Sequence, residues 1–262
     1  MISLSHILKK GIAGDSNFLE QILNTKVHLK LDTKVVILTG AGISAESGLK
    51  TFRDNDGLWE THAVEDVATP EAFARNPQMV WRFYKQRYFQ LSEVVPNPGH
   101  TALAQLEEQL EDRFTLITQN VDGLHSLVGN KRVFEMHGSL KSCFCSRCKA
   151  EFKMERVDLT PEIPLCPSCG GKLRPDIVWF GETPYQLEEL FRAVYHSNVF
   201  VVVGTSGYVY PAAQFLEIAK QNGAYTVGVN LERPLNSEFM DEFHQGRSGD
   251  VLPELIKKWI KQ

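Results

Sequence analysis

KVVILTGAGISAESG, residues 34–48, joins a short apolar run to a glycine-rich turn. The run VVIL is β-branched and too short for a helix, which favours a buried parallel strand. Gly40, Gly42 and Ala45 then fit G-x-G-x-x-G/A, the pattern that follows a strand in dinucleotide-binding folds. Glycines there let backbone amides approach a pyrophosphate, whose charge the start of the following helix attracts. The alternative is a tight strand–helix turn that binds no ligand.

Four further segments repeat this pattern of a short apolar run that ends in polar residues. These expected strands lie within residues 114–125, 133–139, 198–206 and 224–232. Helical patterns occupy residues 77–93, 99–111, 211–223 and 251–262, and one or two polar helices are expected within residues 1–31. Alternating strands and helices predict an α/β fold, a Rossmann-like parallel sheet with helices on both faces. Ligands bind such sheets at the carboxyl ends of the strands, so the polar turns there form the candidate site.

The composition is that of a globular protein with a full core: 262 residues, 43% apolar and 23% charged. A formal net charge of −4 argues against a nucleic-acid or membrane-surface partner. No apolar run reaches the roughly 18 residues of a transmembrane helix, and the N-terminus has no signal-peptide pattern. We therefore expect a cytoplasmic protein, monomeric by default, that binds neither nucleic acid nor membranes.

All five cysteines lie between residues 143 and 169, in a Pro- and Gly-rich stretch that interrupts the strand–helix alternation. Two C-x2-C pairs match the knuckles of a four-thiolate zinc ribbon. The expected ligands are Cys145, Cys148, Cys166 and Cys169. Four thiolates close the tetrahedral site, so this Zn2+ is expected to be structural rather than catalytic. Cys143 is left as a free thiol, and residues 140–175 are expected to form a small inserted zinc-ribbon domain.

A second candidate group is TQNVDGLH, residues 118–125, which follows the second strand. Its amide and carboxylate side chains suit ribose hydroxyls and a carboxamide, although Asp-Gly is also an ordinary turn. The candidate members are Gln119, Asn120, Asp122 and His125. His137 ends the next strand on the same rim, and an imidazole that titrates near neutral pH is a natural general base. The remaining histidines are expected to be structural or on the surface: His6, His28, His62, His100, His196 and His244.

The residues that would bind a ribose here must differ from those of a hydride-transfer dehydrogenase. No acidic residue ends a second strand about 20 residues beyond the glycine turn, where a hydride-transfer enzyme would hold its ribose. The polar loop 51–59 stands there instead. Asn230 and Glu232, at the end of the fifth strand, are therefore the candidates for this contact.

These stretches in combination resemble the sirtuins, the NAD-dependent protein deacylases. The matching segments are 40–59, 118–125, 137–139, the two cysteine pairs, 175–182, 204–206 and 229–232. The resemblance implies a Rossmann-like NAD-binding domain over 34–139 and 176–262, a zinc module over 140–175 and a helical segment over 60–98 that covers the acyl pocket. Residues 1–33, which carry no matching motif, are expected from their own pattern to form an N-terminal helical extension. NAD would be a consumed co-substrate, and acylated-lysine proteins or peptides would be the partners. Lysine, nicotinamide and O-acyl-ADP-ribose would be the products.

The resemblance also implies roles for single residues. His137 would be the general base on a ribose hydroxyl, and Asn120 and Asp122 would position the ribose and nicotinamide. Other cofactor contacts would come from Gly40, Ala41, Gly42, Ala45, Phe52, Arg53, Trp59, Gln119, Gly204, Thr205, Ser206, Asn230, Glu232 and Ser248. The acyl-lysine tunnel would be lined by Val178, Trp179, Phe180 and Gly181, which would pair with the substrate backbone as an added strand.

Tyr84 and Arg87 form a Tyr-x-x-Arg pair similar to that of the sirtuins that prefer succinyl or malonyl groups. Ala68 would enlarge the pocket beside them. A guanidinium offsets the desolvation of an acyl carboxylate through a charge-assisted hydrogen bond, and a phenol adds another. Alternatively, Arg87 pairs with Glu71 or Glu93 on the helix surface, where ion pairs contribute roughly 0–1 kcal/mol.

Three other functions fit parts of the pattern: a plain deacetylase with Arg87 in an internal salt bridge, a protein mono-ADP-ribosyltransferase, and a non-catalytic NAD-binding module. All three would use the same NAD site. The last is disfavoured because a pure binder does not need a base such as His137.

Overall fold

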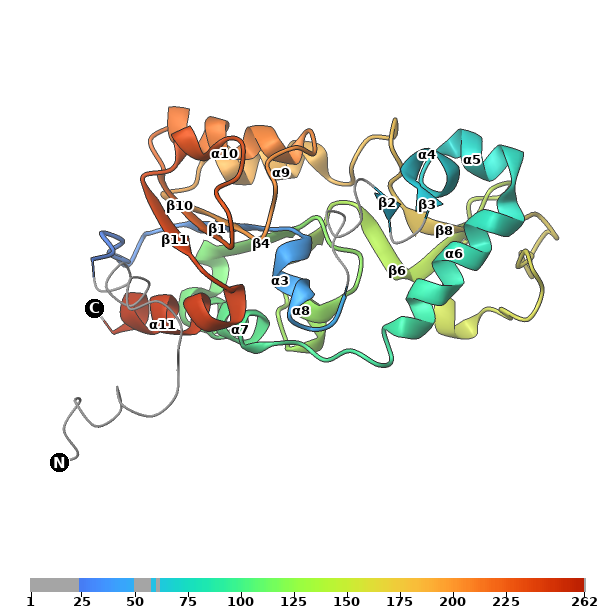
Figure 1. The fold of residues 1–262 in the computed structure, drawn as a ribbon, viewed down its shortest axis with the longest axis horizontal. Coiled ribbons are helices and arrows are strands. Elements are labelled where there is room, and N and C mark those ends of the chain that lie inside the picture. The colour runs from blue at the N-terminus through green and yellow to red at the C-terminus, as the bar shows by residue number, and fades with distance from the viewer. Residues whose placement is uncertain (1–23, 50–57, 60–61, 262) are drawn as a thin grey trace.

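A parallel sheet of six strands in the order β11-β10-β9-β1-β4-β5 organises the larger part of the molecule. The computed structural model describes residues 24–49, 58–59 and 62–261 (Figure 1). The strands are β1 (Val35–Thr39), β4 (Phe114–Thr118), β5 (Val133–Glu135), β9 (Val199–Val203), β10 (Tyr225–Asn230) and β11 (Glu242–Gln245). The sequence predicts the first five, but not β11, because this edge strand is half polar and lacks an apolar run.

Helices cover both faces of the sheet, as the sequence predicts (Figure 1). One face carries α7 (Pro98–Leu110) and α11 (Ser248–Ile260), and the other carries α9 (Leu187–Tyr195) and α10 (Ala212–Gln221). Within β1, Val35 and Ile37 point to the first core, whereas Val36 and Leu38 point to the second. A strand covered on both faces must be apolar on both, which explains the unbroken VVIL run. The predicted α/β fold class is confirmed.

Helix starts follow from local side-chain chemistry. Asn76 accepts a hydrogen bond from the Met79 amide (3.1 Å) at the start of α6 (Pro77–Gln90), and Pro77 occupies the first turn. α7 begins in the same way after Asn97. The sequence does not predict α9, which has only one apolar face, buried against α10. No helix in the part of the chain that the structure describes is long and apolar enough to cross a membrane.

Residues 24–33 are not helical, so the prediction of an N-terminal helical extension is wrong for this part. Buried Thr25 and Val27 alternate with exposed neighbours, a period of two that fits an extended segment rather than a helix. The Lys26 amide donates to the Glu242 carboxylate (3.1 Å), and the Trp259 indole N–H to Thr25 Oγ1 (3.4 Å). Contacts with β11 and α11, distant in sequence, therefore hold this segment extended.

A second, smaller body combines a three-stranded antiparallel sheet with helices α4 to α6 (Figure 1). Its strands, in the order β7-β6-β8, are β6 (Gly138–Cys145), β7 (Glu151–Lys153) and β8 (Leu173–Ile177). The helices are α4 (Val64–Val67), α5 (Pro70–Arg75) and α6. Shorter elements are α3 (Ala41–Ala45), β2 (Leu58–Trp59), β3 (His62–Ala63), α8 (Leu124–Leu127) and the 3-10 turns Glu111–Arg113, Met154–Arg156 and Ser237–Phe239.

Helix α6 holds this smaller body together because it contributes to two cores. Phe83 and Tyr84 pack against Ile177 and Trp179 in one of them. Trp81 packs in the other, among the cysteines of the predicted zinc module, and its indole N–H donates to the Leu173 carbonyl (2.8 Å). The aromatic residues of α6 therefore link the cysteine-rich segment to the face of the helix that carries Tyr84.

Candidate active site

The candidate site lies at the carboxyl ends of β1 and β9, where the order of the sheet reverses. From β1 the chain continues to β4 and β5 on one side, whereas from β9 it continues to β10 and β11 on the other. Ligands of open α/β sheets bind outside the strand ends at such a switch point. Gly40 follows β1 and Gly204 follows β9, so two of the predicted turns meet here.

These two glycine turns pack backbone against backbone. The Gly40 amide donates to the Val203 carbonyl (2.9 Å), and the Gly42 amide to the Gly204 carbonyl (2.8 Å). A Cβ on Gly42 would lie 2.7 Å from Gly204 Cα, and Gly204 itself has φ of +60°. Only glycine permits such an approach. The Gly40 and Gly42 amides therefore join the two turns, and pyrophosphate binding at the turn that they form stays a prediction.

A buried polar cluster centred on Ser44, which the sequence does not single out, lies behind the turn. Asn120 Nδ2 donates to the Gly40 carbonyl (3.1 Å) and to Ser44 Oγ (3.0 Å). Ser44 Oγ donates to one Asp122 oxygen (2.8 Å), and the other accepts the Leu124 amide (2.9 Å). Burial raises the pKa of the Asp122 carboxyl, although these hydrogen bonds oppose the rise. Asn120 and Asp122 are thus oriented in advance at the end of β4.

His100 and His125 extend this cluster into the core, with their rings 4.8 Å apart. His125 Nε2 lies 3.0 Å from Thr39 Oγ1, and His100 Nε2 lies 3.4 Å from Ser44 Oγ. Burial lowers the pKa of His100 to about 4 and that of His125 to about 3, so both rings are neutral at pH 7. His100 is not among the site residues predicted from sequence. The sequence signal that marks it is its place three residues after Asn97, because the His100 ring accepts a hydrogen bond from the Asn97 amide (3.3 Å).

His137 is held in one tautomer by the backbone of β4's end. Its Nδ1 lies 3.1 Å from the Gln119 carbonyl oxygen. A carbonyl only accepts, so Nδ1 carries the hydrogen and Nε2 keeps the lone pair. Burial lowers the pKa of His137, although the bond to Gln119 opposes this. The ring is therefore neutral at pH 7, with Nε2 as its basic atom.

Gln119 also joins the rim to the turn after β9. Its Nε2 donates to Thr205 Oγ1 (3.1 Å), and Asn230 Nδ2 donates to the Thr205 carbonyl (2.8 Å). The hydrogen bonds and the glycine packing thus bring together eight residues predicted from sequence: Gly40, Gln119, Asn120, Asp122, His137, Gly204, Thr205 and Asn230.

Gly138 joins His137 to the segment that follows β8. Its φ is +81°, and a Cβ there would lie 2.1 Å from the Asp176 carbonyl oxygen. The next contact is the Val178 amide, which donates to the His137 carbonyl (2.9 Å). The glycine of the HGS stretch is therefore required by the close approach of β8 to the residue after His137.

Tyr84 and Arg87 lie on the buried side of α6. Tyr84 Oη accepts a hydrogen bond from Trp179 Nε1 (3.0 Å). The Arg87 guanidinium stacks 3.4 Å from the centre of the Phe83 ring and donates to the Phe83 carbonyl (2.8 Å). Arg87 is only 6% exposed, which rules out the alternative of a solvent-exposed ion pair on the helix surface.

The segment 178–181 leaves β8 beside these residues. Trp179 is buried, whereas Phe180 is 51% exposed and Gly181 is exposed with φ of +89°. The Phe180 amide donates to the Ala68 carbonyl (3.0 Å). The structure therefore places Ala68, which was predicted from sequence, directly against this segment.

The four predicted zinc ligands come together, with their sulfur atoms all within 4.8 Å of one another. Cys145 and Cys169 Sγ are 3.5 Å apart, and Cys148 and Cys166 Sγ are 3.7 Å apart. Two sulfurs bound to one tetrahedral Zn2+ at about 2.3 Å would be separated by about 3.8 Å, so the four thiols fit this metal. Cys143 lies outside the set, fully buried, and burial raises its pKa to about 12.

The remaining predicted residues are dispersed or not described. Phe52 and Arg53 lie outside the described residues, as does the side chain of Trp59. Ala41 and Ala45 lie in α3, Ser206 accepts the Leu235 amide through its carbonyl (3.2 Å), Glu232 is exposed beyond β10, and Ser248 is buried at the first position of α11.

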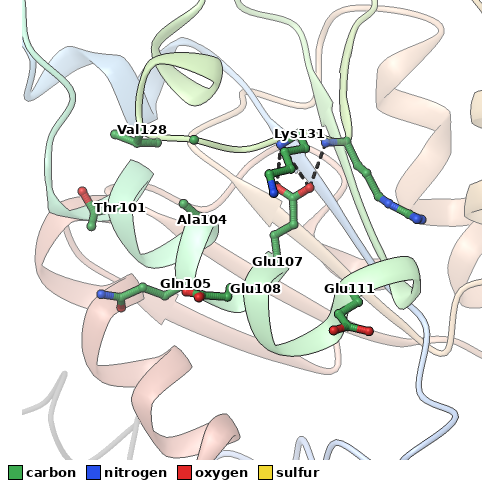
Figure 2. A pocket seen from close by; sticks show the side chains of 10 residues that line it. Thr101, Ala104, Gln105, Glu107, Glu108, Glu111, Val128 and Lys131 are labelled. Carbon is green, nitrogen blue, oxygen red and sulfur yellow. Dashed lines mark hydrogen bonds between the residues drawn. The ribbon is translucent and has the colours of Figure 1, made fainter.

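A groove of about 530 Å³ lies elsewhere, between α7 and the connection from α8 to β5 (Figure 2). Glu107 in its wall accepts hydrogen bonds from the Lys131 amide (3.0 Å), the Arg132 amide (2.8 Å) and Asn130 Nδ2 (2.6 Å). Its carboxylate thus fixes the loop that leads into β5. None of the residues predicted for the site lines this groove.

Comparisons with known proteins agree with this geometry. The model of the Sir2 family matches residues 40–211. An NAD-dependent protein deacylase of Salmonella typhimurium is 50% identical over 233 residues, which cover 87% of this chain and 84% of that protein. A crystal structure of a Sir2 homologue–NAD complex is 38% identical with a TM-score of 0.80, and the match covers 94% of each chain. A Sir2 structure with a deacetylated p53 peptide and 3'-O-acetyl ADP ribose is 30% identical with a TM-score of 0.79, covering 93% of this chain and 97% of that one.

Proposed function

Because the chain belongs to the Sir2 family, we propose that it is an NAD-dependent protein-lysine deacylase that transfers the acyl group of lysine to ADP-ribose. The observation that carries the proposal is the position of His137. Its neutral ring, with Nε2 as the basic atom, lies between the end of β4, where Gln119 accepts its Nδ1–H, and the segment 178–181, whose Val178 amide donates to the His137 carbonyl. The switch point supplies the expected place for NAD, and relatives bound to NAD and to a deacetylated peptide support both ligands.

NAD, when bound, would supply an electrophilic ribose carbon, which the acyl oxygen of the substrate lysine would attack as nicotinamide leaves. His137 Nε2 would be the general base that takes the proton of a ribose hydroxyl, so that this oxygen takes over the acyl carbon and free lysine is released. Asn120 and Asp122, already oriented by Ser44, hold ribose and nicotinamide in place without a reorganisation cost at the moment of reaction. The segment 178–181 pairs with the substrate backbone and directs the acyl-lysine toward the rim.

A structural Zn2+ is held by the four thiols of Cys145, Cys148, Cys166 and Cys169. The metal supplies no catalytic step because its coordination is complete. The enzyme acts on acylated-lysine proteins as a monomer in the cytoplasm. The buried thiol of Cys143 and the gathering of the other four cysteines in one cluster support a reducing compartment.

The acyl group is an acidic one, succinyl or malonyl, that Tyr84 and Arg87 bind through its carboxylate. Burial of both side chains on one face of α6 supports this assignment. Desolvating a carboxylate in an apolar pocket costs several kcal/mol, which a guanidinium offsets by a paired, charge-assisted bond. Acetyl-lysine has no such carboxylate, so its turnover depends little on Arg87.

The test is one reaction series with NAD and acetyl-, malonyl- and succinyl-lysine peptides, followed by mass spectrometry. We expect O-acyl-ADP-ribose and deacylated peptide, and a loss of about 100-fold in kcat/KM on succinyl-lysine for Arg87→Met, equivalent to about 3 kcal/mol, with little change on acetyl-lysine. Arg82→Met, an exposed arginine on the same helix, is the matched control.

The outcomes separate the competing functions. A succinyl-to-acetyl ratio that Arg87→Met leaves unchanged refutes acid selection, and a faster wild-type reaction on acetyl-lysine supports a plain deacetylase. Labelled NAD that modifies the protein without any acyl substrate identifies an ADP-ribosyltransferase. Absence of nicotinamide release leaves an NAD-binding module.

A further inference from the structure

Trp179 and Tyr84 form a buried hydrogen bond whose direction is set by chemistry. Trp179 Nε1 and Tyr84 Oη are 3.0 Å apart, and the two residues are 2% and 0% exposed. An indole N–H only donates, so Tyr84 Oη is the acceptor. The bond occupies one lone pair of the phenol oxygen and leaves the phenol's own hydrogen directed elsewhere. Burial raises the pKa of Tyr84, so this hydrogen is retained at neutral pH.

Trp179 is itself held on three sides. Arg174 stacks 3.6 Å from the centre of its ring and donates to both oxygens of Glu182 (2.8 and 2.9 Å). One of these oxygens also accepts the Trp179 amide (2.8 Å), and Arg174 donates to the Ile177 carbonyl (2.9 Å). The centre of the Phe73 ring lies 5.4 Å from the centre of the Trp179 ring. The bidentate pair thus fixes both the backbone and the ring plane of Trp179.

We propose that Trp179 is a specificity-determining positioning residue: its indole N–H orients the Tyr84 hydroxyl as a donor toward an acyl carboxylate, and the Arg174–Glu182 pair holds the indole in place. The inference rests on the proposed binding of acidic acyl groups by Tyr84 and Arg87. The Trp179–Tyr84 hydrogen bond joins the segment expected to bind the substrate backbone to the helix expected to bind the end of the acyl group.

The arrangement acts on acidic and neutral acyl groups differently. A hydroxyl donor fixed in advance gains a charge-assisted bond to a carboxylate, whereas an acetyl group presents no acceptor at that depth. Loss of the indole N–H removes the bond that selects this hydroxyl orientation but leaves the phenol in place. The consequence is a fall in the succinyl-to-acetyl ratio of kcat/KM, rather than an equal loss on both peptides.

A double-mutant cycle tests the proposal with wild type, Trp179→Phe, Tyr84→Phe and the double variant, each assayed on succinyl- and acetyl-lysine peptides. We expect each single variant to lower the ratio by about 10- to 150-fold, the range for one hydrogen bond to a charged group. The double variant should lower it no further than Tyr84→Phe alone, because Trp179 acts through that hydroxyl.

Two further variants separate positioning from loss of packing. Trp81→Phe also removes a buried indole N–H, the one that Leu173 accepts, and should change both peptides alike. Glu182→Gln weakens the clamp while keeping its shape, and should lower the ratio several-fold even if Trp179→Phe folds poorly.

The results distinguish the role of Trp179 from the binding of the acyl carboxylate by Tyr84. If Tyr84→Phe lowers the ratio but Trp179→Phe and Glu182→Gln do not, or if the losses in the cycle simply add, the role of Trp179 is refuted while acyl reading by Tyr84 stands. An unchanged ratio in Tyr84→Phe refutes both. A Trp81→Phe variant that lowers the ratio as much as Trp179→Phe assigns the effect to packing.

Discussion

Replacing Gly138 by alanine tests whether the approach of β8 to the residue after His137 positions that histidine. The added Cβ would lie 2.1 Å from the Asp176 carbonyl oxygen and 3.2 Å from Ile177 Cα, both backbone atoms that cannot rotate away. Gly138 pairs with Ile177 in the small sheet, and the Val178 amide donates to the His137 carbonyl (2.9 Å). Relief of the clash must therefore separate β6 from β8 at this point.

The expected loss of stability has three parts. Alanine at a φ of +81° costs about 1–2 kcal/mol. Forcing a methyl group against backbone at this distance costs about 1–3 kcal/mol through displacement, and loss of one backbone hydrogen bond adds about 1 kcal/mol. A total of about 4 kcal/mol is below the stability of a typical domain, so Gly138→Ala should still fold.

Gly223→Ala is the matched control. Gly223 has φ of +86°, but a Cβ there meets nothing within 4 Å. It shares the backbone strain and lacks the clash, so it should lose only about 1–2 kcal/mol and keep full activity. Urea unfolding measures stability, and deacylation kinetics on a peptide measure activity. Displacement of His137 by about 1 Å should lower kcat about 100-fold in Gly138→Ala only.

The reasoning is refuted by a Gly138→Ala enzyme that matches Gly223→Ala in both stability and kcat. Equal stability with a selective loss of kcat would leave the positioning role but remove the clash as its source. A large loss of stability with unchanged kcat would confirm the clash and show that His137 does not depend on it.

Two further predictions concern protons and metal. In the folded protein the pKa values of His100 (about 4) and His125 (about 3) lie below the ordinary value of a histidine. The free energy of unfolding is therefore highest above about pH 6.5. It falls by about 2 kcal/mol per histidine between about pH 7.5 and 5, because the unfolded chain binds the added protons more readily. Urea unfolding at both pH values should show about half of this dependence in His125→Asn and all of it in the exposed control His28→Asn; identical curves would contradict the burial argument. Removal of zinc, by chelation or by Cys166→Ser, should loosen α6 through Trp81 and lower both the melting temperature and activity, with bound zinc measured by elemental analysis. Cys143→Ala should keep its zinc, and a variant that loses it would place Cys143 in the metal site.

Local sequence patterns predicted much of the fold. The β-branched runs mark β1, β4, β9 and β10, and the helical patterns mark α6, α7, α10 and α11. The cysteine spacing picked out the four thiols that gather. These features depend on neighbouring residues, whose backbone preferences and side-chain bonds act over a turn or less.

The errors occur where contacts between distant segments prevail. Residues 24–33 are extended because β11 and α11 bind them, and the edge strand β11 forms by pairing with β10 although its own residues are half polar. His100 looked unremarkable in the sequence because its partner Ser44 belongs to another segment. The partners of the Gly40 and Gly42 amides, the carbonyls of Val203 and Gly204, likewise belong to a segment far along the chain.

The sequence by itself therefore determined the α/β class, the family resemblance and the chemistry of the candidate groups. Only the tertiary structure decided which groups meet: Gly42 with Gly204, His137 with Gln119, and Tyr84 with Trp179. The physical reason is that β1 lies between β9 and β4, so the strand ends that form the site come from segments far apart in the chain. Spacing along the sequence carries the local preferences, whereas sheet order and side-chain packing set the distances between those segments.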